Sequence, residues 1–180
     1  MEPAHRTTVE DHVNRTPGLG ASMIPFAGWY KVVVLDVGTL SMATHPAPNA
    51  KFNKWLKEVL SAKIELRVPE ISDYELRREL IRSEKTNSLA KLDKFSNAVG
   101  YVPIDTKAMK LAAEFWADLR NKDQPTADDK SLDADVILAA QAVCLIDDGY
   151  EPIVATNNVR HLARLTDADR WENLVVGKTL

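Results

Sequence analysis

The run Lys31-Val-Val-Val-Leu-Asp36 places a strongly apolar segment directly before a carboxylate. Four consecutive apolar residues, three of them β-branched, are typical of a strand that is covered on both faces, as in a parallel α/β sheet. Ligands of open parallel sheets bind beyond the carboxyl ends of the strands. Asp36 is therefore predicted to lie at a binding edge, although an Asp after a strand is also a common turn former or helix cap.

The length and composition of the chain favour one domain, or one domain with a tail. A chain of 180 residues buries roughly 70% of the surface of its unfolded form. No run approaches the about 20 apolar residues of a membrane span, and residues 1–20 lack the apolar core of a secretory signal. The single cysteine, Cys144, provides neither a disulfide framework nor a cysteine-based zinc site. We expect a cytoplasmic protein, and its net charge of -3 argues against indiscriminate coating of nucleic acid.

Strands and helices are predicted to alternate after a polar extension. Residues 1–28, rich in Gly and Pro, are interpreted as a flexible N-terminal extension, and residues 29–180 as the folded domain. Alternation predicts an α/β fold with a mostly parallel central sheet. Predicted strands are 31–35, 64–68, 101–104, 152–155 and 171–176. Predicted helices are 50–60 with Asn49 as cap, 71–82, 88–99, 106–119 with Thr106 as cap, and 133–146. Predicted loops are 37–48 and 121–130.

Asp133-Ala-Asp135 begins a segment that is apolar on nearly every side, as buried helices are. Helical positions two residues apart point about 200° apart, so both carboxylates cannot face one site from within the helix. We expect Asp133 to be the N-cap and Asp135 to lie in the first turn, where the helix dipole favours an ionised carboxylate. Capping alone would explain both acids equally well. The helix fits a domain core or a dimer interface.

Glu75 lies in the middle of a predicted helix and has Arg78 as its i+3 neighbour. A surface ion pair is the ordinary explanation of such spacing. Glu75 and Arg78 nevertheless flank Ile71, which we expect to face inward, so Glu75 is predicted to be partly buried.

A polar turn, Thr156-Asn-Asn158, follows the strand predicted over 152–155. Thr156 and Asn158 can hydrogen bond to a metal-bound water, although two asparagines also suit a plain turn.

Acids gathered at one edge of a sheet raise each other's pKa unless a cation lies between them. An all-oxygen set of ligands, with no cysteine and little histidine, favours Mg²⁺ or Mn²⁺. Such an ion orients a phosphate and activates water. The predicted metal and phosphate site consists of Asp36, Glu75 and Asp135.

Four segments resemble, in order, the motifs of the PIN domain, the nuclease fold of VapC-type toxins from bacterial toxin–antitoxin pairs. The segments are Val34-Leu-Asp36, 69–76, 135–142 and 153–162. The resemblance implies a three-layer α/β/α fold and divalent-metal-dependent endoribonuclease activity with Asp36, Glu75 and Asp135 as the catalytic, metal-binding acids. It also implies a homodimer and a cognate antitoxin that holds the protein inactive.

In this interpretation, metal-activated water hydrolyses RNA phosphodiester bonds. Asp133 or Asn158 would join the metal site by holding an outer-shell water. Candidate substrate contacts are Arg78, Thr156 and Arg160. His161 is a further candidate for contact with the substrate backbone, or a helix-end cap near Leu162, and it is assigned no catalytic role. A solvated surface explains the two arginines and His161 equally well.

Two departures from the family pattern motivate an alternative. Val37-Gly38 replaces the Thr-Asn that often follows the first Asp, and Asn158 stands where many members carry a fourth Asp. The alternative is a catalytically weakened PIN-fold module that binds RNA or a protein partner without cleavage. A phosphatase needs an Asp at the place of Gly38, and a receiver needs a Lys where the Asn157-Asn158 pair stands, so both are disfavoured.

Overall fold

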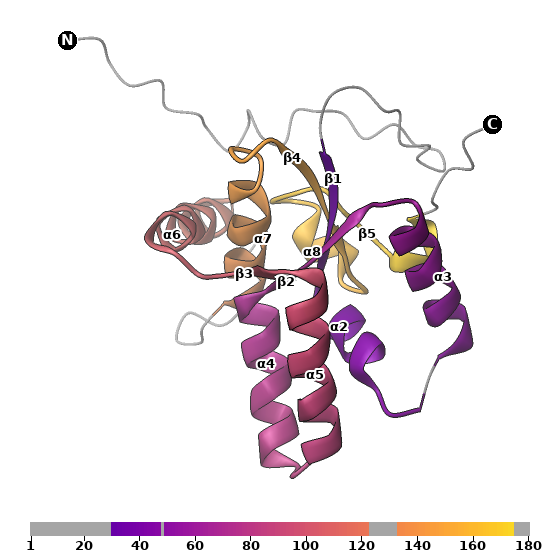
Figure 1. The fold of residues 1–180 in the computed structure, drawn as a ribbon. Helices are drawn as coiled ribbons and strands as arrows, with labels where there is room; N and C mark the ends of the chain where they lie inside the picture. The colour runs from indigo at the N-terminus through magenta and orange to yellow at the C-terminus, as the bar shows by residue number, and fades with distance from the viewer. Residues whose placement is uncertain (1–29, 48, 123–132, 175–180) are drawn as a thin grey trace.

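A five-stranded parallel sheet forms the centre of the protein, in the order β3-β2-β1-β4-β5 (Figure 1). Our computed structural model describes residues 30–47, 49–122 and 133–174. Every strand pair in this part of the chain is parallel, which confirms the α/β prediction. The strands are β1 (Tyr30–Leu35), β2 (Glu65–Pro69), β3 (Tyr101–Val102), β4 (Tyr150–Ala155) and β5 (Ala168–Asp169).

Helices cover both faces of the sheet, so the structure has the three layers that the resemblance implies. Side chains of β1 alternate between two cores: Val32 and Val34 pack in one, and Val33 and Leu35 in the other. Burial on both faces explains why β1 is a continuous apolar run. The first core contains residues of α6 (Thr106–Asn121), α7 (Ala134–Cys144) and α8 (Val159–Leu162). The second contains residues of α2 (Val37–Thr44), α3 (Ala50–Ser61), α5 (Thr86–Val99) and the 3-10 helix η1 (Trp171–Asn173).

Helix α4 (Glu70–Arg82) contributes to both cores, with Ile71 in the first and Leu76 in the second. Helix α7 is buried at every position from Val136 to Val143. Of the two roles that its apolar sequence allowed, α7 therefore takes the core of the domain.

Capping residues begin several helices where the sequence predicts them. The Asn49 side chain accepts hydrogen bonds from the Lys51 and Phe52 amides, each at 3.1 Å, and Asp133 caps α7. Thr106 was the wrong cap for α6. Asp105 is the N-cap, and its Oδ1 accepts a hydrogen bond from the Ala108 amide at 2.7 Å. Asp105 and Thr106 are both residue types that cap helices, so the local sequence does not distinguish them. In the structure Asp105 has the extended backbone conformation of an N-cap.

The prediction of a loop over 37–48 was wrong, because α2 occupies Val37–Thr44. Gly38 lowers the helix propensity of this segment. Burial of Thr39, Leu40 and Thr44 against the sheet layer outweighs that cost. Asp36 is the N-cap of α2.

The predicted strand over 171–176 was also wrong within the described residues, since Trp171–Asn173 forms η1 and β5 lies just before it. Trp171 packs in an aromatic cluster, with ring centroids 5.3 Å from Phe52 and 5.8 Å from Trp55. This tertiary packing determines the conformation at Trp171. The strand predicted over 101–104 is shorter, with two residues in β3.

The predicted extension over 1–28 lies outside the described residues, as does most of the predicted loop over 121–130. Among the helices of the described part, none has the length and apolar character needed to cross a membrane.

Candidate active site

Asp36 and Thr156 meet at the carboxyl ends of the adjacent strands β1 and β4. The Thr156 hydroxyl donates a hydrogen bond to Asp36 Oδ2 at 2.6 Å, and the Val37 amide donates to Asp36 Oδ1 at 2.5 Å. The Thr156 hydroxyl also accepts a hydrogen bond from the Asn158 amide at 2.8 Å. Thr156 is fully buried, so its hydroxyl acts on Asp36 and does not directly contact a substrate. Both carboxylate oxygens of Asp36 are thereby oriented.

Asp135 lies in the first turn of α7, two residues after the N-cap Asp133, as predicted. Its Oδ2 accepts a hydrogen bond from Asn158 Nδ2 at 3.1 Å and lies 3.3 Å from His161 Nδ1. The turn that follows β4 therefore contacts both Asp36 and Asp135.

His161, which was given no catalytic role from the sequence, belongs to this group through its contact with Asp135, and that contact was not predicted. His161 is three positions after Asn158, which is the N-cap of α8. Residues at i and i+3 lie on one face of a helix. This spacing could have predicted that Asn158 and His161 contact the same group.

Glu75 reaches the same region from the middle of α4. Its side chain is 26% exposed, which confirms the predicted partial burial, and the Arg78 guanidinium lies 3.8 Å from Glu75 Oε1. Arg78 itself is 53% exposed and also packs over the Tyr74 ring at 5.3 Å. Arg160 is exposed on α8. The two arginines predicted to contact substrate are therefore accessible to solvent.

The pKa of each of the three acids is raised, and the charge of Asp36 contributes to this in both Glu75 and Asp135. Burial raises the pKa of Asp36 most, against hydrogen bonds from Thr156 and Val37 that lower it. Burial also raises the pKa of Glu75, and the charges of Asp36 and Asp135 raise it further against the lowering effect of Arg78. The charges at the end of β1 and on α7 therefore both act on the carboxyl group of α4.

Burial is likewise the main cause that raises the pKa of Asp135, followed by the charge of Asp36. Contact with His161 lowers this pKa, and the charge of Asp133 raises it. Asp133 is buried, and its Oδ1 accepts a long hydrogen bond of 3.5 Å from the Val136 amide. Its position in the structure is that of a helix cap.

The donor chemistry of the acidic centre (Asp36, Glu75 and Asp135) fits a hard divalent cation, because carboxylate oxygens and excess negative charge favour Mg²⁺ or Mn²⁺. As the side chains stand, no three His, Cys, Asp or Glu residues in the described ranges are grouped closely enough to hold a metal ion. A shared ion therefore requires the carboxylates to turn toward one another.

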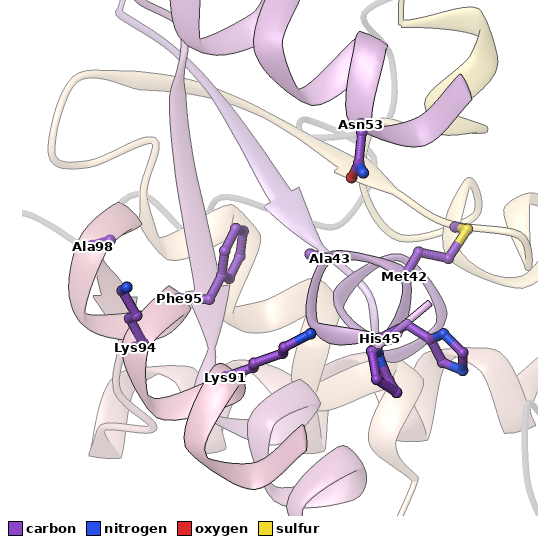
Figure 2. Close-up of a pocket in the computed structure, with 9 residues that line it drawn as sticks. Met42, Ala43, His45, Asn53, Lys91, Lys94, Phe95 and Ala98 are labelled. Carbon is purple, nitrogen blue, oxygen red and sulfur yellow. The ribbon is translucent and has the colours of Figure 1, made fainter. Parts of the chain in front are cut away.

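A separate groove of about 420 Å³ lies at the C-terminal end of α2 (Figure 2). Asp36 caps the opposite end of that helix. The apolar wall of the groove combines side chains of α2 and α5, and two lysines of α5 border it. The residues that line this α2–α5 groove are Met42, Ala43, His45, Pro46, Asn53, Lys91, Lys94, Phe95 and Ala98.

No protein-family model matches the chain, and no curated protein matches it. Solved structures do. A chain from the crystal structure of VapBC2 from Rickettsia felis, bound to a DNA fragment from their promoter, is 19% identical with a TM-score of 0.62, and the match covers 78% of this chain and 98% of that chain.

Two further structures give similar values. A chain of FitAcB from Neisseria gonorrhoeae is 20% identical, with a TM-score of 0.58 over 79% of this chain and 99% of that chain. A chain of VapBC-1 from nontypeable Haemophilus influenzae is 16% identical, with a TM-score of 0.60 over 78% and 98%. Identities this low establish the fold alone. The PIN-like fold that the sequence motifs predicted, as found in VapBC and FitAB complexes, is confirmed.

Proposed function

We propose that this chain is a divalent-metal-dependent endoribonuclease of the PIN type and the toxin of a toxin–antitoxin pair. The observation that carries the proposal is electrostatic. Asp36, Glu75 and Asp135 are far apart in the sequence but lie close enough at the carboxyl edge of the sheet to interact. The charge of Asp36 raises the pKa of both other acids, and the charge of Asp135 raises the pKa of Glu75. Ligands bind at this edge in open parallel sheets.

Neighbouring side chains hold two of the three acids in place. Thr156 fixes Asp36, while Asn158 and His161 both contact one oxygen of Asp135. Hydrogen-bonded partners of this kind orient the carboxylates of metal sites. The chemistry that Mg²⁺ or Mn²⁺ supplies in such a site is charge neutralisation at a phosphate and activation of water.

Two exposed cations are available for the RNA backbone. Arg78 lies beside Glu75, and Arg160 lies on α8 next to His161. Guanidinium groups bind phosphate oxygens well because their donors are planar and paired. We assign both residues to substrate binding, and we assign an outer-shell position to Asn158 or Asp133.

An inhibitory partner is the second part of the proposal. The structural neighbours are VapBC and FitAB complexes. In this chain the α2–α5 groove combines an apolar wall with Lys91 and Lys94 (Figure 2). This chemistry suits an apolar segment of an antitoxin that also carries acidic side chains. The homodimer implied by the sequence resemblance remains a prediction.

Asp36→Asn is the test of the nuclease proposal. Asparagine is as good an N-cap as aspartate, so α2 keeps its cap while the site loses a negative ligand. We expect Mn²⁺-dependent cleavage of a labelled RNA to fall by more than about 100-fold, which exceeds the usual effect of losing an outer-shell partner. EDTA gives the metal-free baseline, and far-UV circular dichroism checks the fold.

Asp118→Asn is the matched control, because Asp118 lies on α6 and pairs with Lys122 away from the acidic centre. This control is expected to cleave like the parent. Equal cleavage by Asp36→Asn and the parent would refute the role of Asp36. A parent protein that binds RNA but does not cleave it in Mn²⁺ would favour the catalytically weakened module instead.

A further inference from the structure

Gln141 is a buried polar residue of α7 whose side chain joins two other elements. It is 1% exposed. Its Oε1 accepts a hydrogen bond from the Ile71 amide of α4 at 3.3 Å, and its Nε2 donates to the Val102 carbonyl of β3 at 2.6 Å. Both ends of the carboxamide are thus used, and they contact different parts of the chain.

Helix α4 has no side-chain cap of its own. Its N-cap residue is Pro69, which provides no hydrogen-bonding side chain, because β2 passes directly into the helix. The first amides of a helix lack partners within the helix. The Glu70 carboxylate accepts from the Ile104 amide at 2.6 Å, away from the first turn of α4. The Ile71 amide is instead capped by Gln141, from another helix.

This contact joins the helices that carry two residues of the acidic centre. Glu75 is four residues, about one turn, after Ile71 on α4, and Asp135 precedes Gln141 on α7. The packing around this contact includes the apolar side chains of Ile71 and Val102. Two other hydrogen bonds join α4 to the β3 region, from the Tyr101 hydroxyl to Asp73 at 3.5 Å and from the Ile104 amide to Glu70, and neither reaches α7. Apolar packing is non-directional, whereas a donor and an acceptor at fixed places define one arrangement.

We infer that Gln141 is a positioning residue, which sets the position of α4 relative to α7 and thereby the separation of the Glu75 and Asp135 carboxylates. The effect of this positioning on metal binding rests on the proposed nuclease site. The side chain does not act on the substrate. It acts through the placement of the two helices.

Gln141→Met tests this inference, because methionine has a similar length and volume but removes both hydrogen bonds. Val59→Ala is the matched control: Val59 is 1% exposed on α3 and belongs to the other core. Both variants are expected to lower stability. Amide hydrogen exchange of Ile71, measured by NMR, and Mn²⁺ affinity, measured by calorimetry, are compared at a temperature where all forms are folded.

In Gln141→Met we expect exchange of the Ile71 amide to accelerate about tenfold or more, and the Mn²⁺ dissociation constant to rise about tenfold or more. In Val59→Ala we expect the Mn²⁺ dissociation constant to stay within about twofold of the parent, and exchange of the Ile71 amide to accelerate by no more than the loss of global stability accounts for. Unchanged protection of Ile71 in Gln141→Met, or an equal loss of Mn²⁺ affinity in both variants, would overturn the inference.

Failure of the proposed function has a different signature. A parent protein that does not bind Mn²⁺ refutes the metal site, and with it the functional part of the positioning role. If Gln141→Met does not fold, Gln141→Asn serves with the same two measurements, because it keeps the carboxamide but is one methylene too short to span the distance from α7 to both Ile71 and Val102.

Discussion

Thr156 illustrates at the residue scale how one hydroxyl can organise a site. It donates to Asp36 Oδ2 and accepts from the amide of Asn158, whose side chain in turn donates to Asp135. A hydroxyl can donate and accept at once, which a carboxylate cannot do. One small buried residue thereby links the turn after β4 to two of the three acids.

Thr156→Val removes this hydroxyl while keeping the branched shape of the side chain. We expect metal-dependent cleavage to fall by about 10–100-fold, because Asp36 loses an orienting partner. The free energy of unfolding should fall by about 1–3 kcal/mol, since a buried acceptor loses its donor. Cleavage of labelled RNA and urea unfolding measure the two effects.

Thr44→Val is the control for Thr156→Val. Thr44 is also buried, but its hydroxyl bonds to the Leu40 carbonyl within α2, at 3.1 Å. Loss of that bond should affect stability and leave cleavage near the parent value. Comparable cleavage by Thr156→Val and Thr44→Val would contradict the role assigned to Thr156.

At the scale of the elements, α2 takes part in both functional regions. Its first residue follows Asp36, and its last turn helps to form the α2–α5 groove (Figure 2). Helix α4 has a similar double role, since it carries Glu75 and contributes to both cores. Helix α2, whose residues were predicted to form a loop, therefore contributes both to the proposed site and to the proposed docking surface.

Reversing the charge of the groove tests the partner proposal. The probe is the proposed antitoxin, taken as the protein encoded by the neighbouring reading frame. We expect the double variant Lys91→Glu, Lys94→Glu to bind it at least about tenfold more weakly than the parent does, because acidic side chains of the partner would meet like charges. Co-expression and calorimetry give the measurement. Lys110→Glu, on α6 at the other face of the sheet, reverses one lysine away from the groove and should bind like the parent.

No binding of that protein by the parent would refute its role as the partner. Equal weakening by Lys110→Glu would show a general charge effect and would remove the groove from the proposal.

At the scale of the whole molecule, the acidic centre makes stability depend on pH. A carboxyl group whose pKa is higher in the folded than in the unfolded state stabilises the fold at low pH, and this contribution is lost as pH rises through the folded-state pKa. The pKa of Asp36, Glu75 and Asp135 is raised in the folded state. The metal-free protein should therefore lose stability as pH rises from about 4, the ordinary carboxyl range.

Asp135→Asn should weaken this pH dependence, because the variant lacks one of the three coupled charges. Urea midpoints at several pH values, in EDTA, measure the difference between the variant and the parent. Added Mn²⁺ should raise the midpoint of the parent at neutral pH and have less effect on Asp135→Asn. An identical pH profile for the two proteins would refute the coupling.

Local patterns were sufficient to predict much of this protein. The apolar run of β1, the inward face of α4 and the apolar α7 are short-range features, so the α/β class and the position of Asp36 could be predicted from them. The caps Asn49 and Asp133 were predicted for the same reason, since each of these side chains bonds to an amide within one turn of its own helix.

Only the tertiary structure decided how these parts meet. The hydrogen bond between Thr156 and Asp36 joins residues 120 positions apart, and the bond between Gln141 and Ile71 spans 70 positions. No local pattern encodes such pairs. Helix α2 likewise depends on burial against the sheet, which outweighs the weak helix propensity at Gly38. Local sequence determined most of the strands and helices, because periodicity and capping act within a few residues. Packing among distant segments determined α2, η1 and which side chains share a site.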